Sequence, residues 1–352
     1  MRRAEWKATA VVLLFFAALW APLIGMLFGV GNFEPEEENR SFGAPPQGGR
    51  QFTAYIHDHF GFRGTLITAQ ALFKVRVLGV SSSNEVLLGR DGWLFYAGDK
   101  SVENHRGVRP YTRDELTRWV NLFKRRGDWL AERGIHMIVA IPPDKISVYP
   151  EFLPASFGKV KQQTRLDEFL AEMRSASHVP VLDLRQAMLR AKVQGSRLYH
   201  PTDTHWTAEG AYTGYLSILA ELSKTYPEVR PVPFRQAPRG RLGAGDLVKM
   251  LGLARVWRDV PDEQPWPPEL HVRGRVEEEL VVQHEGNAER RLMLFGDSFA
   301  FALVPYLAQD FGETIIFRSS ELNLGAIAGR HPNIVLIEMV ERKLNLAAPE
   351  DR

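Results

Sequence analysis

The stretch Arg291–Leu303 (RLMLFGDSFAFAL) constrains the fold more than any other segment of the chain. Leu292–Phe295 is apolar throughout, Gly296 interrupts it, and apolar residues return at helical spacing over Phe299–Gln309. A short run without polar residues is typical of a strand that is covered on both faces. We therefore expect a buried strand, a tight turn that carries Asp297 and Ser298, and a helix.

Four more apolar runs follow the same pattern. They are Met137–Ile141, Val181–Leu184, Thr314–Phe317 and Ile334–Ile337, and amphipathic stretches separate them. Apolar strands that alternate with amphipathic helices indicate an α/β fold with a mainly parallel sheet covered on both faces. Ligands of such sheets bind beyond the carboxyl ends of the strands, where Ser298 is expected. No glycine-rich phosphate-binding motif is present, so nothing supports nucleotide binding.

Ser298 has two interpretations. At a helix N-terminus, the backbone N–H groups around a serine can stabilise an oxyanion that forms on an acyl group bound to its oxygen. Asp or Ser after a strand is also the ordinary way to cap a helix. Taken alone, the stretch favours capping.

A second polar cluster, His200–Trp206 (HPTDTHW), changes that balance. Asp203 and His205 lie two positions apart, and in an extended segment their side chains point the same way. They can then act as general base and orienting carboxylate for Ser298, in the chain order Asp, His, Ser. Metal binding by His200, Asp203 and His205, or simple loop polarity, are the alternatives.

The N-terminal segment is predicted to cross a membrane. Ala8–Val30 carries no charge and is long enough to span a bilayer. Arg2, Arg3 and Lys7 precede it, so the N-terminus is expected in the cytoplasm and the rest of the chain across the membrane. A cleaved signal peptide is the alternative, but no clean cleavage site follows at Gly29–Asn32. We expect an uncleaved, single-pass anchor.

These signals divide the chain into segments. Residues 1–31 form a cytoplasmic tip and the transmembrane anchor, and residues 32–84 form a juxtamembrane linker and a helical region. Residues 85–346 form the catalytic α/β domain, in which 227–290 is an irregular insertion, and residues 347–352 form a tail. The net charge of +2 gives no reason to expect nucleic acid as a partner. The chain has no cysteine, which excludes disulfides and thiolate metal sites.

A set of motifs resembles one known family. The set comprises Asp-Thr-His-Trp at 203–206, Gly-Asp-Ser-Phe at 296–299, Pro-Pro-Asp-Lys with Tyr-Pro-Glu-Phe-Leu-Pro within 142–154, Glu-Met-Val-Glu-Arg at 338–342, and the hairpin sequence GRDGWLF at 89–95. In content and order these motifs resemble the alginate O-acetyltransferase AlgJ/AlgX family. Longer members add a C-terminal carbohydrate-binding module, whereas this sequence stops about ten residues after Arg342. We therefore expect the chain to be more similar to the membrane-anchored AlgJ-like members.

The resemblance implies an SGNH-hydrolase-like α/β/α sandwich with circularly permuted motif order, so that the Asp-His pair precedes the serine. It implies an acetyl group carried on Ser298, with His205 as base, Asp203 as its orienting partner, and no cofactor or metal. The implied partners are a polysaccharide acceptor and a membrane-bound O-acyltransferase that brings acetyl groups across the membrane. The implied location is the bacterial inner membrane, with the catalytic domain in the periplasm.

Three functions fit these residues. The first is an O-acetyltransferase that acetylates an exported polysaccharide through an acetyl-serine. If water replaces the sugar hydroxyl, the same triad makes a polysaccharide acetylesterase. If Ser298 is only a cap, the chain is a non-catalytic subunit of a membrane acetylation complex. Near the site, we expect Arg342 and Glu338 to be structural ion-pair residues, and Lys145 either to line the pocket or to pack against its loop.

Overall fold

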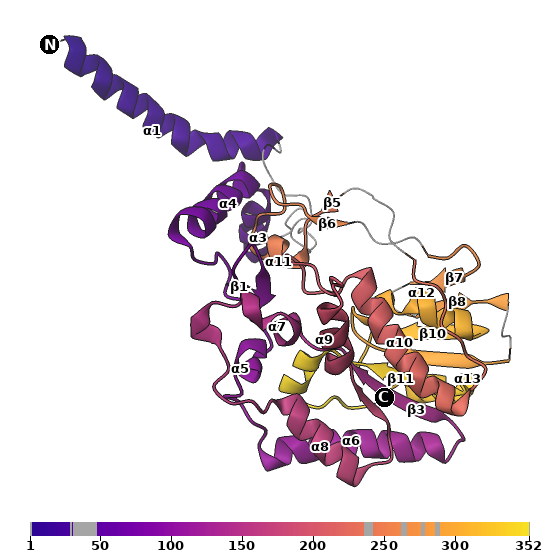
Figure 1. Cartoon of the computed structure of the whole chain (residues 1–352). Coiled ribbons are helices and arrows are strands. Elements are labelled where there is room, and N and C mark those ends of the chain that lie inside the picture. Colours follow the sequence, from indigo (N-terminus) through magenta and orange to yellow (C-terminus); the bar gives the residue numbers. More distant parts are fainter. Residues whose placement is uncertain are drawn as a thin grey trace. The chain divides into compact units, whose positions relative to one another are not determined.

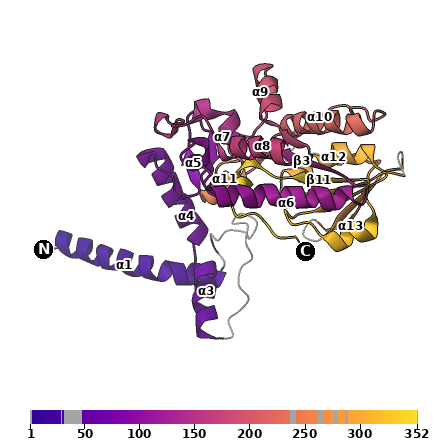
Figure 2. The same ribbon diagram turned by 90° about the horizontal axis from the view of Figure 1, so that it is seen from below.

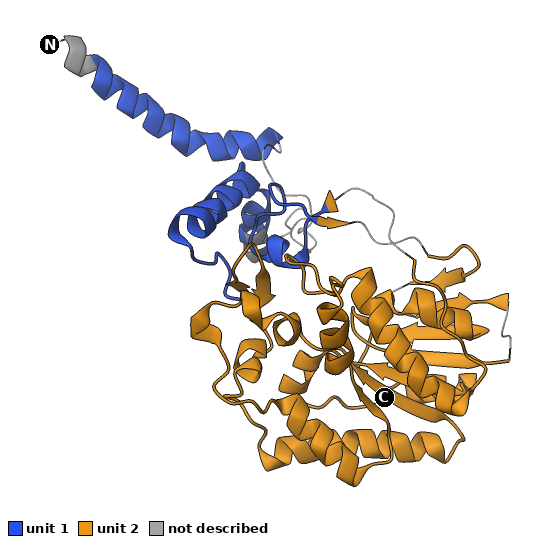
Figure 3. Cartoon of the chain, in the orientation of Figure 1, with its two compact units in different colours: residues 1–86, 243–259 blue, residues 87–242, 260–352 orange. Residues whose placement is uncertain are grey.

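The chain forms two compact units in a computed structural model that describes residues 2–28, 30, 48–235, 242–261, 266–275, 279–285 and 289–351. Unit 1 comprises residues 1–86 and 243–259, and unit 2 comprises residues 87–242 and 260–352 (Figure 3). Of the expected linker, Asn32–Gly49, residues 32–47 lie outside the described residues, and so does the candidate cleavage site at Gly29–Asn32, apart from Val30.

Unit 2 is built on a seven-stranded sheet with the strand order β4-β3-β11-β9-β10-β8-β7 (Figure 1). Its strands are β3 (His136–Ile141), β4 (Val181–Asp183), β7 (His271–Gly274), β8 (Leu280–Gln283), β9 (Arg291–Phe295), β10 (Glu313–Phe317) and β11 (Ile334–Glu338). Strands β4, β3, β11, β9 and β10 run parallel, and β8 and β7 add an antiparallel edge. The predicted α/β fold with a mainly parallel sheet is confirmed.

Helices cover both faces of this sheet (Figure 2). One layer contains α6 (Arg113–Ala131), α8 (Arg165–Ala176) and α13 (Leu324–Arg330), and the other contains α9 (Arg185–Val193), α10 (Ala208–Thr225) and α12 (Val304–Leu307). In β9, Leu292 and Leu294 pack in the α10 layer, whereas Met293 and Phe295 pack in the α6 layer. Alternate side chains of a strand point to opposite faces, so a strand with two covered faces must be apolar throughout.

The remaining elements are short. They are β1 (Val86–Leu88), β2 (Leu94–Tyr96), α5 (Ser101–His105), α7 (Lys145–Val148), η2 (Pro150–Phe152), η3 (Ala155–Phe157), β5 (Leu242–Gly243), β6 (Val260–Pro261), η5 (Ala300–Ala302), η6 (Ala308–Asp310) and η7 (Glu341–Asn345). The predicted hairpin around residues 89–92 is present, because β1 and β2 pair and the Gly89 N–H donates to the Trp93 carbonyl at 2.8 Å.

The helix expected directly after Ser298 is not continuous. Residues 300–310 form η5, α12 and η6 in succession, and Pro305 lies in the first turn of α12. Proline has no N–H to donate to the preceding turn, so it starts a helix but does not continue one. The periodicity of Phe299–Gln309 was helical, but the prediction of one regular helix is wrong.

The segment 227–290, expected to be irregular, contributes two strands to the main sheet. Leu280 and Val282 of β8 are buried, and Val281 pairs with Ile315 of β10. Because β8 and β7 are only four residues long, their alternation is too brief to stand out from the Pro-, Gly- and Arg-rich sequence around them.

Unit 1 is helical. It contains α1 (Arg2–Phe28), α3 (Gly49–His59), α4 (Arg63–Leu72), the π-helical turn η1 (Phe73–Leu78) and α11 (Asp246–Met250). Gly61 lies between α3 and α4. Among the described residues, α1 is the one helix long and apolar enough to cross a membrane, over Trp6–Phe28 with a mean hydropathy of 2.5.

The cap of α10 gives a first prediction. The Thr207 hydroxyl accepts the Gly210 N–H at 3.2 Å and donates to the Arg197 carbonyl. We expect Thr207→Ala to lower the free energy of unfolding by about 1 kcal/mol, because one helix N–H loses its acceptor. Thr207→Ser keeps the hydroxyl and should unfold close to the wild-type temperature. An equal loss in both variants, measured by thermal unfolding followed by circular dichroism, would assign the effect to the methyl group instead.

Candidate active site

One carboxylate fixes the turn that follows β9. Asp297 Oδ1 accepts the Phe299 N–H at 2.9 Å, and Oδ2 accepts the Val340 N–H at 3.0 Å. The N–H of Asp297 donates to Glu338 Oε2 at 3.0 Å. Hydrogen bonds to charged groups are among the stronger ones, so the turn is held firmly against the carboxyl end of β11.

Gly296 allows this close approach. A Cβ atom at Gly296 would lie 2.8 Å from Glu338 Oε2 and 2.6 Å from the Cβ of Ala300, so no side chain fits there. Glu338 is fully buried. Burial, together with the nearby Asp297 carboxylate, raises the pKa of Glu338 well above its usual value.

Ser298 is not the capping residue of this turn. Its Oγ lies 2.7 Å from His205 Nε2, while Asp297 takes the Phe299 N–H. The backbone N–H of Ser298 has no hydrogen-bond acceptor among the described residues. This donor is therefore available to an oxyanion on an acyl group at Ser298. Because no regular helix begins at Ser298, local N–H groups rather than a helix dipole would provide that stabilisation.

Asp203 and His205 meet through a turn and not along the extended segment that we expected. A bridge between Tyr199 and Trp206 closes the loop, and Asp203 Oδ1 accepts the His205 N–H at 2.9 Å. The same oxygen lies 2.6 Å from His205 Nδ1. A carboxylate only accepts hydrogen bonds, so Nδ1 carries the proton and Nε2 is left to accept the Ser298 hydroxyl.

The structure thus brings the three predicted residues together across 93 positions of sequence. The side chain of His205 is 34% exposed and that of Asp203 is 14% exposed. A substrate can therefore approach this hydrogen-bonded row of three side chains from the His205 and Ser298 end. Among the described residues, no set of candidate ligand atoms within 4.8 Å of one another includes His200. The alternative metal site of His200, Asp203 and His205 is therefore not assembled.

Lys145 holds the loop that carries Asp203. Its Nζ donates to the carbonyls of His200 at 3.0 Å, Pro201 at 3.0 Å and Asp203 at 2.7 Å. The side chain is buried, and the ammonium group lies 5.8 Å from the centre of the Trp93 ring. All three protons of the ammonium group thus point to one loop, which makes Lys145 a positioning residue for the Asp-His pair.

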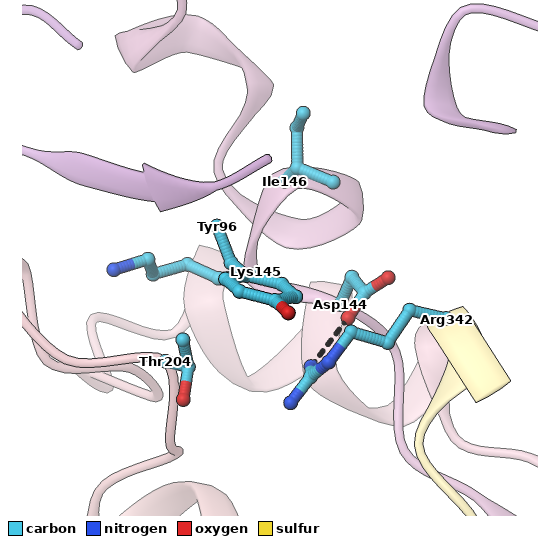
Figure 4. Close-up of a pocket in the computed structure, with 6 residues that line it drawn as sticks. All are labelled: Tyr96, Asp144, Lys145, Ile146, Thr204 and Arg342. Carbon is cyan, nitrogen blue, oxygen red and sulfur yellow. Dashed lines mark hydrogen bonds and ion pairs between the residues drawn. The ribbon is translucent and has the colours of Figure 1, made fainter. Parts of the chain in front are cut away.

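A small hollow lies beside the loop that carries Asp203 and His205. It is lined by Tyr96, Asp144, Lys145, Ile146, Thr204 and Arg342 (Figure 4). Thr204 lies between Asp203 and His205 in sequence, so the hollow adjoins that pair. Both expectations for Lys145 hold, because it lines this hollow and also packs against the loop.

Arg342 forms a structural ion pair, as we expected, but its partner is Asp144. Arg342 Nη1 donates to Asp144 Oδ1 at 2.7 Å, and the guanidinium group lies 5.4 Å from the centre of the Phe299 ring. Glu338 instead accepts the Asp297 N–H. We did not identify Asp144 as a site residue from sequence. Its place directly after β3, at the same sheet edge as Ser298, was the signal that could have found it.

Glu341 is buried beneath this ion pair. Its Oε2 accepts the Asp144 N–H at 3.0 Å and the Ser147 hydroxyl at 2.7 Å. Burial, with the charge of Asp144 adding to it, raises the pKa of Glu341 to about 7.

Comparison with known proteins shows that the chain matches one family model. The family model described as SGNH hydrolase-like domain, acetyltransferase AlgX, matches residues 86–327, which is more than half of the 352-residue chain. This match agrees with the resemblance seen in the sequence motifs.

Curated relatives carry related names. The chain is 27% identical to the probable alginate O-acetylase AlgJ of Pseudomonas aeruginosa over 200 residues, which cover 53% of this chain and 46% of the relative. It is 31% identical to the probable alginate O-acetylase AlgJ of Pseudomonas putida over 139 residues, which cover 40% of this chain and 34% of the relative. The matched part of this chain thus spans less than half the length of either relative.

A solved structure has the same fold. Bacillus cereus PatB1 superposes with a TM-score of 0.53 at 18% sequence identity, covering 74% of this chain and 96% of that chain. Together with the family match, this confirms the expected SGNH-like α/β/α fold of unit 2.

Lys145 gives a second prediction. Lys145→Met leaves three loop carbonyls without their donor, so we expect the free energy of unfolding to fall by about 3 kcal/mol. Amide hydrogen exchange over residues 200–205 should accelerate. Lys192→Met is a matched control. Lys192 also donates to a carbonyl, that of Val148, but only to one, and its side chain is 25% exposed, so the loss should be less than about 1 kcal/mol. Equal losses in the two variants would argue against a special role for Lys145.

Glu341 gives a third prediction, on pH dependence. The folded chain holds the Glu341 proton up to about pH 7, whereas the ordinary pKa is 4.5. The unfolding free energy should therefore fall as pH rises from about 4.5 to about 7, by on the order of 2 kcal/mol, because the folded state binds more protons in that window. In Glu341→Gln the decline over this window should be smaller by that amount. Thermal unfolding across the window measures it, and parallel wild-type and variant curves would contradict the assignment.

Proposed function

The chain belongs to the AlgX family of SGNH hydrolase-like acetyltransferase domains, and from this premise we propose that it is an O-acetyltransferase that acetylates an exported polysaccharide through an acetyl group held on Ser298. One observation carries the proposal: Asp203, His205 and Ser298 form a hydrogen-bonded chain with distances of 2.6 Å and 2.7 Å. The names of the curated relatives, probable alginate O-acetylases, support a polysaccharide as the acceptor.

The first half-reaction loads the enzyme. Ser298 Oγ attacks the carbonyl carbon of an acetyl donor while His205 Nε2 takes the hydroxyl proton. Asp203 stabilises the imidazolium ion that forms. The Ser298 N–H donates to the tetrahedral oxyanion, which is typically worth about 3 kcal/mol. The donor's leaving group departs with the proton from His205, and an acetyl ester remains on Ser298.

The second half-reaction unloads it. A sugar hydroxyl gives its proton to His205 and attacks the acetyl carbonyl. The bond to Ser298 Oγ breaks, Ser298 recovers its proton from His205, and the acetylated sugar leaves. The same residues thus act twice, and the acceptor determines the product.

Two further parts of the proposal involve the membrane: the location of the chain and the source of its acetyl groups. We propose that α1 anchors the chain in the bacterial inner membrane with unit 2 in the periplasm. Its length and apolar character support this, as do the Arg and Lys residues before it. A membrane-bound O-acyltransferase is the proposed partner that supplies acetyl groups on the periplasmic side.

The test of the proposed function is a transfer assay with the full chain in detergent micelles. With an activated acetyl ester and an oligosaccharide, the wild type should form acetylated sugar. Ser298→Ala and His205→Ala should each lower the rate by about 10⁶-fold, and Asp203→Asn by about 10⁴-fold. Ser175→Ala, an exposed serine on α8, is the matched control and should be unchanged.

Two results would favour the other functions. Release of acetate that no added sugar can divert would make the chain an acetylesterase, and the exposed His205 ring is compatible with access of water. Turnover that is the same with and without Ser298 would make it a non-catalytic subunit.

A further inference from the structure

The apolar stripe of α4 and η1 lies on the outside of unit 1. Sequence spacing groups Leu66, Ala69, Phe73 and Val77 on one helix face, and an amphipathic helix normally buries such a face. Here Leu66 is 55%, Phe73 54% and Val77 67% exposed. A row of large apolar side chains at the surface marks an interaction site.

The opposite face of α4 is already occupied by unit 1 itself. Gly64, Thr68 and Ala71 are buried, and the Thr68 hydroxyl donates to the Gly252 carbonyl at 3.0 Å. The orientation of the helix is therefore set by contacts inside unit 1, and the outward stripe is a consequence of that packing.

The turn that leads into α4 packs against the end of α1. The Gly61 N–H donates to the Pro22 carbonyl at 3.2 Å, and the Phe62 N–H donates to the Val30 carbonyl at 2.8 Å. A Cβ atom at Gly61 would lie 2.3 Å from the Pro22 carbonyl oxygen, and one at Gly25 would lie 2.9 Å from the Phe62 ring. Both glycines are thus needed for this contact, which places the start of α4 next to the last two turns of α1 (Figure 1).

That end of α1 is part of the apolar span. Within Trp6–Phe28, only 6% of the most apolar 18-residue window is buried. Leu23, Leu27 and Phe28 are exposed beside the contact with Gly61. A helix rises 1.5 Å per residue, so Pro22 lies only about 9 Å along the axis from Phe28. When α1 crosses a bilayer, the start of α4 therefore lies at the depth of the headgroups on the side where the helix emerges.

We propose that α4 and η1 lie in the surface of the bilayer that α1 crosses, with Leu66, Phe73 and Val77 in contact with lipid chains. Lys74 and Arg76 are next to the stripe, and their long side chains can reach headgroup phosphates while their stems cover apolar surface. This inference rests on the membrane part of the proposed function, since α1 must be embedded for the stripe to meet lipid.

The absence of cysteine makes the test direct, because a single introduced cysteine gives a single labelled site. A fluorescent thiol label is placed at Leu66→Cys, Phe73→Cys or Val77→Cys in the full chain, which is reconstituted in vesicles of phosphatidylcholine and phosphatidylglycerol. Quenchers attached at shallow or deep positions of the lipid chain report the depth of the label. We expect all three labels about 5–10 Å below the headgroup surface.

Two further label sites separate the possible failures. A label at Leu14→Cys in α1 should be quenched from deep positions, and a label at Val193→Cys, 88% exposed on α9, should not be quenched by lipid. If Leu14→Cys is not quenched, the proposal that α1 spans the bilayer is wrong. If Leu14→Cys is quenched but the α4 and η1 labels respond only to a quencher in water, α1 still spans the bilayer and this inference is wrong.

A double substitution tests the stripe itself. Phe73→Asp with Val77→Asp puts two charges on the face, so the label at Leu66→Cys should move out of reach of the lipid quenchers while the label at Leu14→Cys stays embedded. An unchanged depth at Leu66 would show that the anchor alone holds this segment near lipid. Protection of the Phe73 label from both lipid and water quenchers would instead identify a protein as the occupant and overturn the inference.

Discussion

The arrangement of the site depends on two acidic side chains behind the serine. Asp297 accepts N–H groups from Phe299 and Val340, and Glu338 accepts the N–H of Asp297. These bonds consume the donors on either side of Ser298 and leave its own N–H without an acceptor among the described residues. The strand β9 brings the serine to the sheet edge, but the carboxyl groups decide which donor stays available for chemistry.

The second half of the site is positioned by a cation and not by a strand. The Asp203–His205 segment forms a turn, and the buried Lys145 ammonium group gathers three of its carbonyls. Burying that charge is costly unless all its protons are used, and here each has an acceptor. Three residues carry the proposed chemistry. The residues that position them are Lys145 at the start of α7, Asp297 in the turn after β9 and Glu338 at the end of β11.

The sequence was sufficient to predict the fold class and the three residues that the structure brings together at the candidate site, because both leave local marks. A strand buried on two faces must be apolar, as Leu292–Phe295 is. The motifs at 203–206 and 296–299 contain the Asp, His and Ser residues themselves, so they can be recognised in the sequence. The sequence did not reveal which side chains far apart in the chain pair with one another in the fold. The partner of Arg342 is Asp144, almost two hundred positions away, and no local pattern distinguishes it from Glu338. The stripe of α4 is a similar case, since its spacing predicts a buried face and only the packing of Gly61 and Thr68 shows that it points outward.

The central claim is that Ser298 carries the acetyl group between donor and acceptor. The most direct measurement is peptide mass spectrometry of the full chain, quenched in acid shortly after it is mixed with an acetyl donor and before any sugar is added. We expect one added acetyl group on the peptide that contains Ser298, and we expect it to disappear when a sugar acceptor is supplied. An acetyl group that forms on another residue at the same rate, or none on that peptide while transfer proceeds, would contradict it.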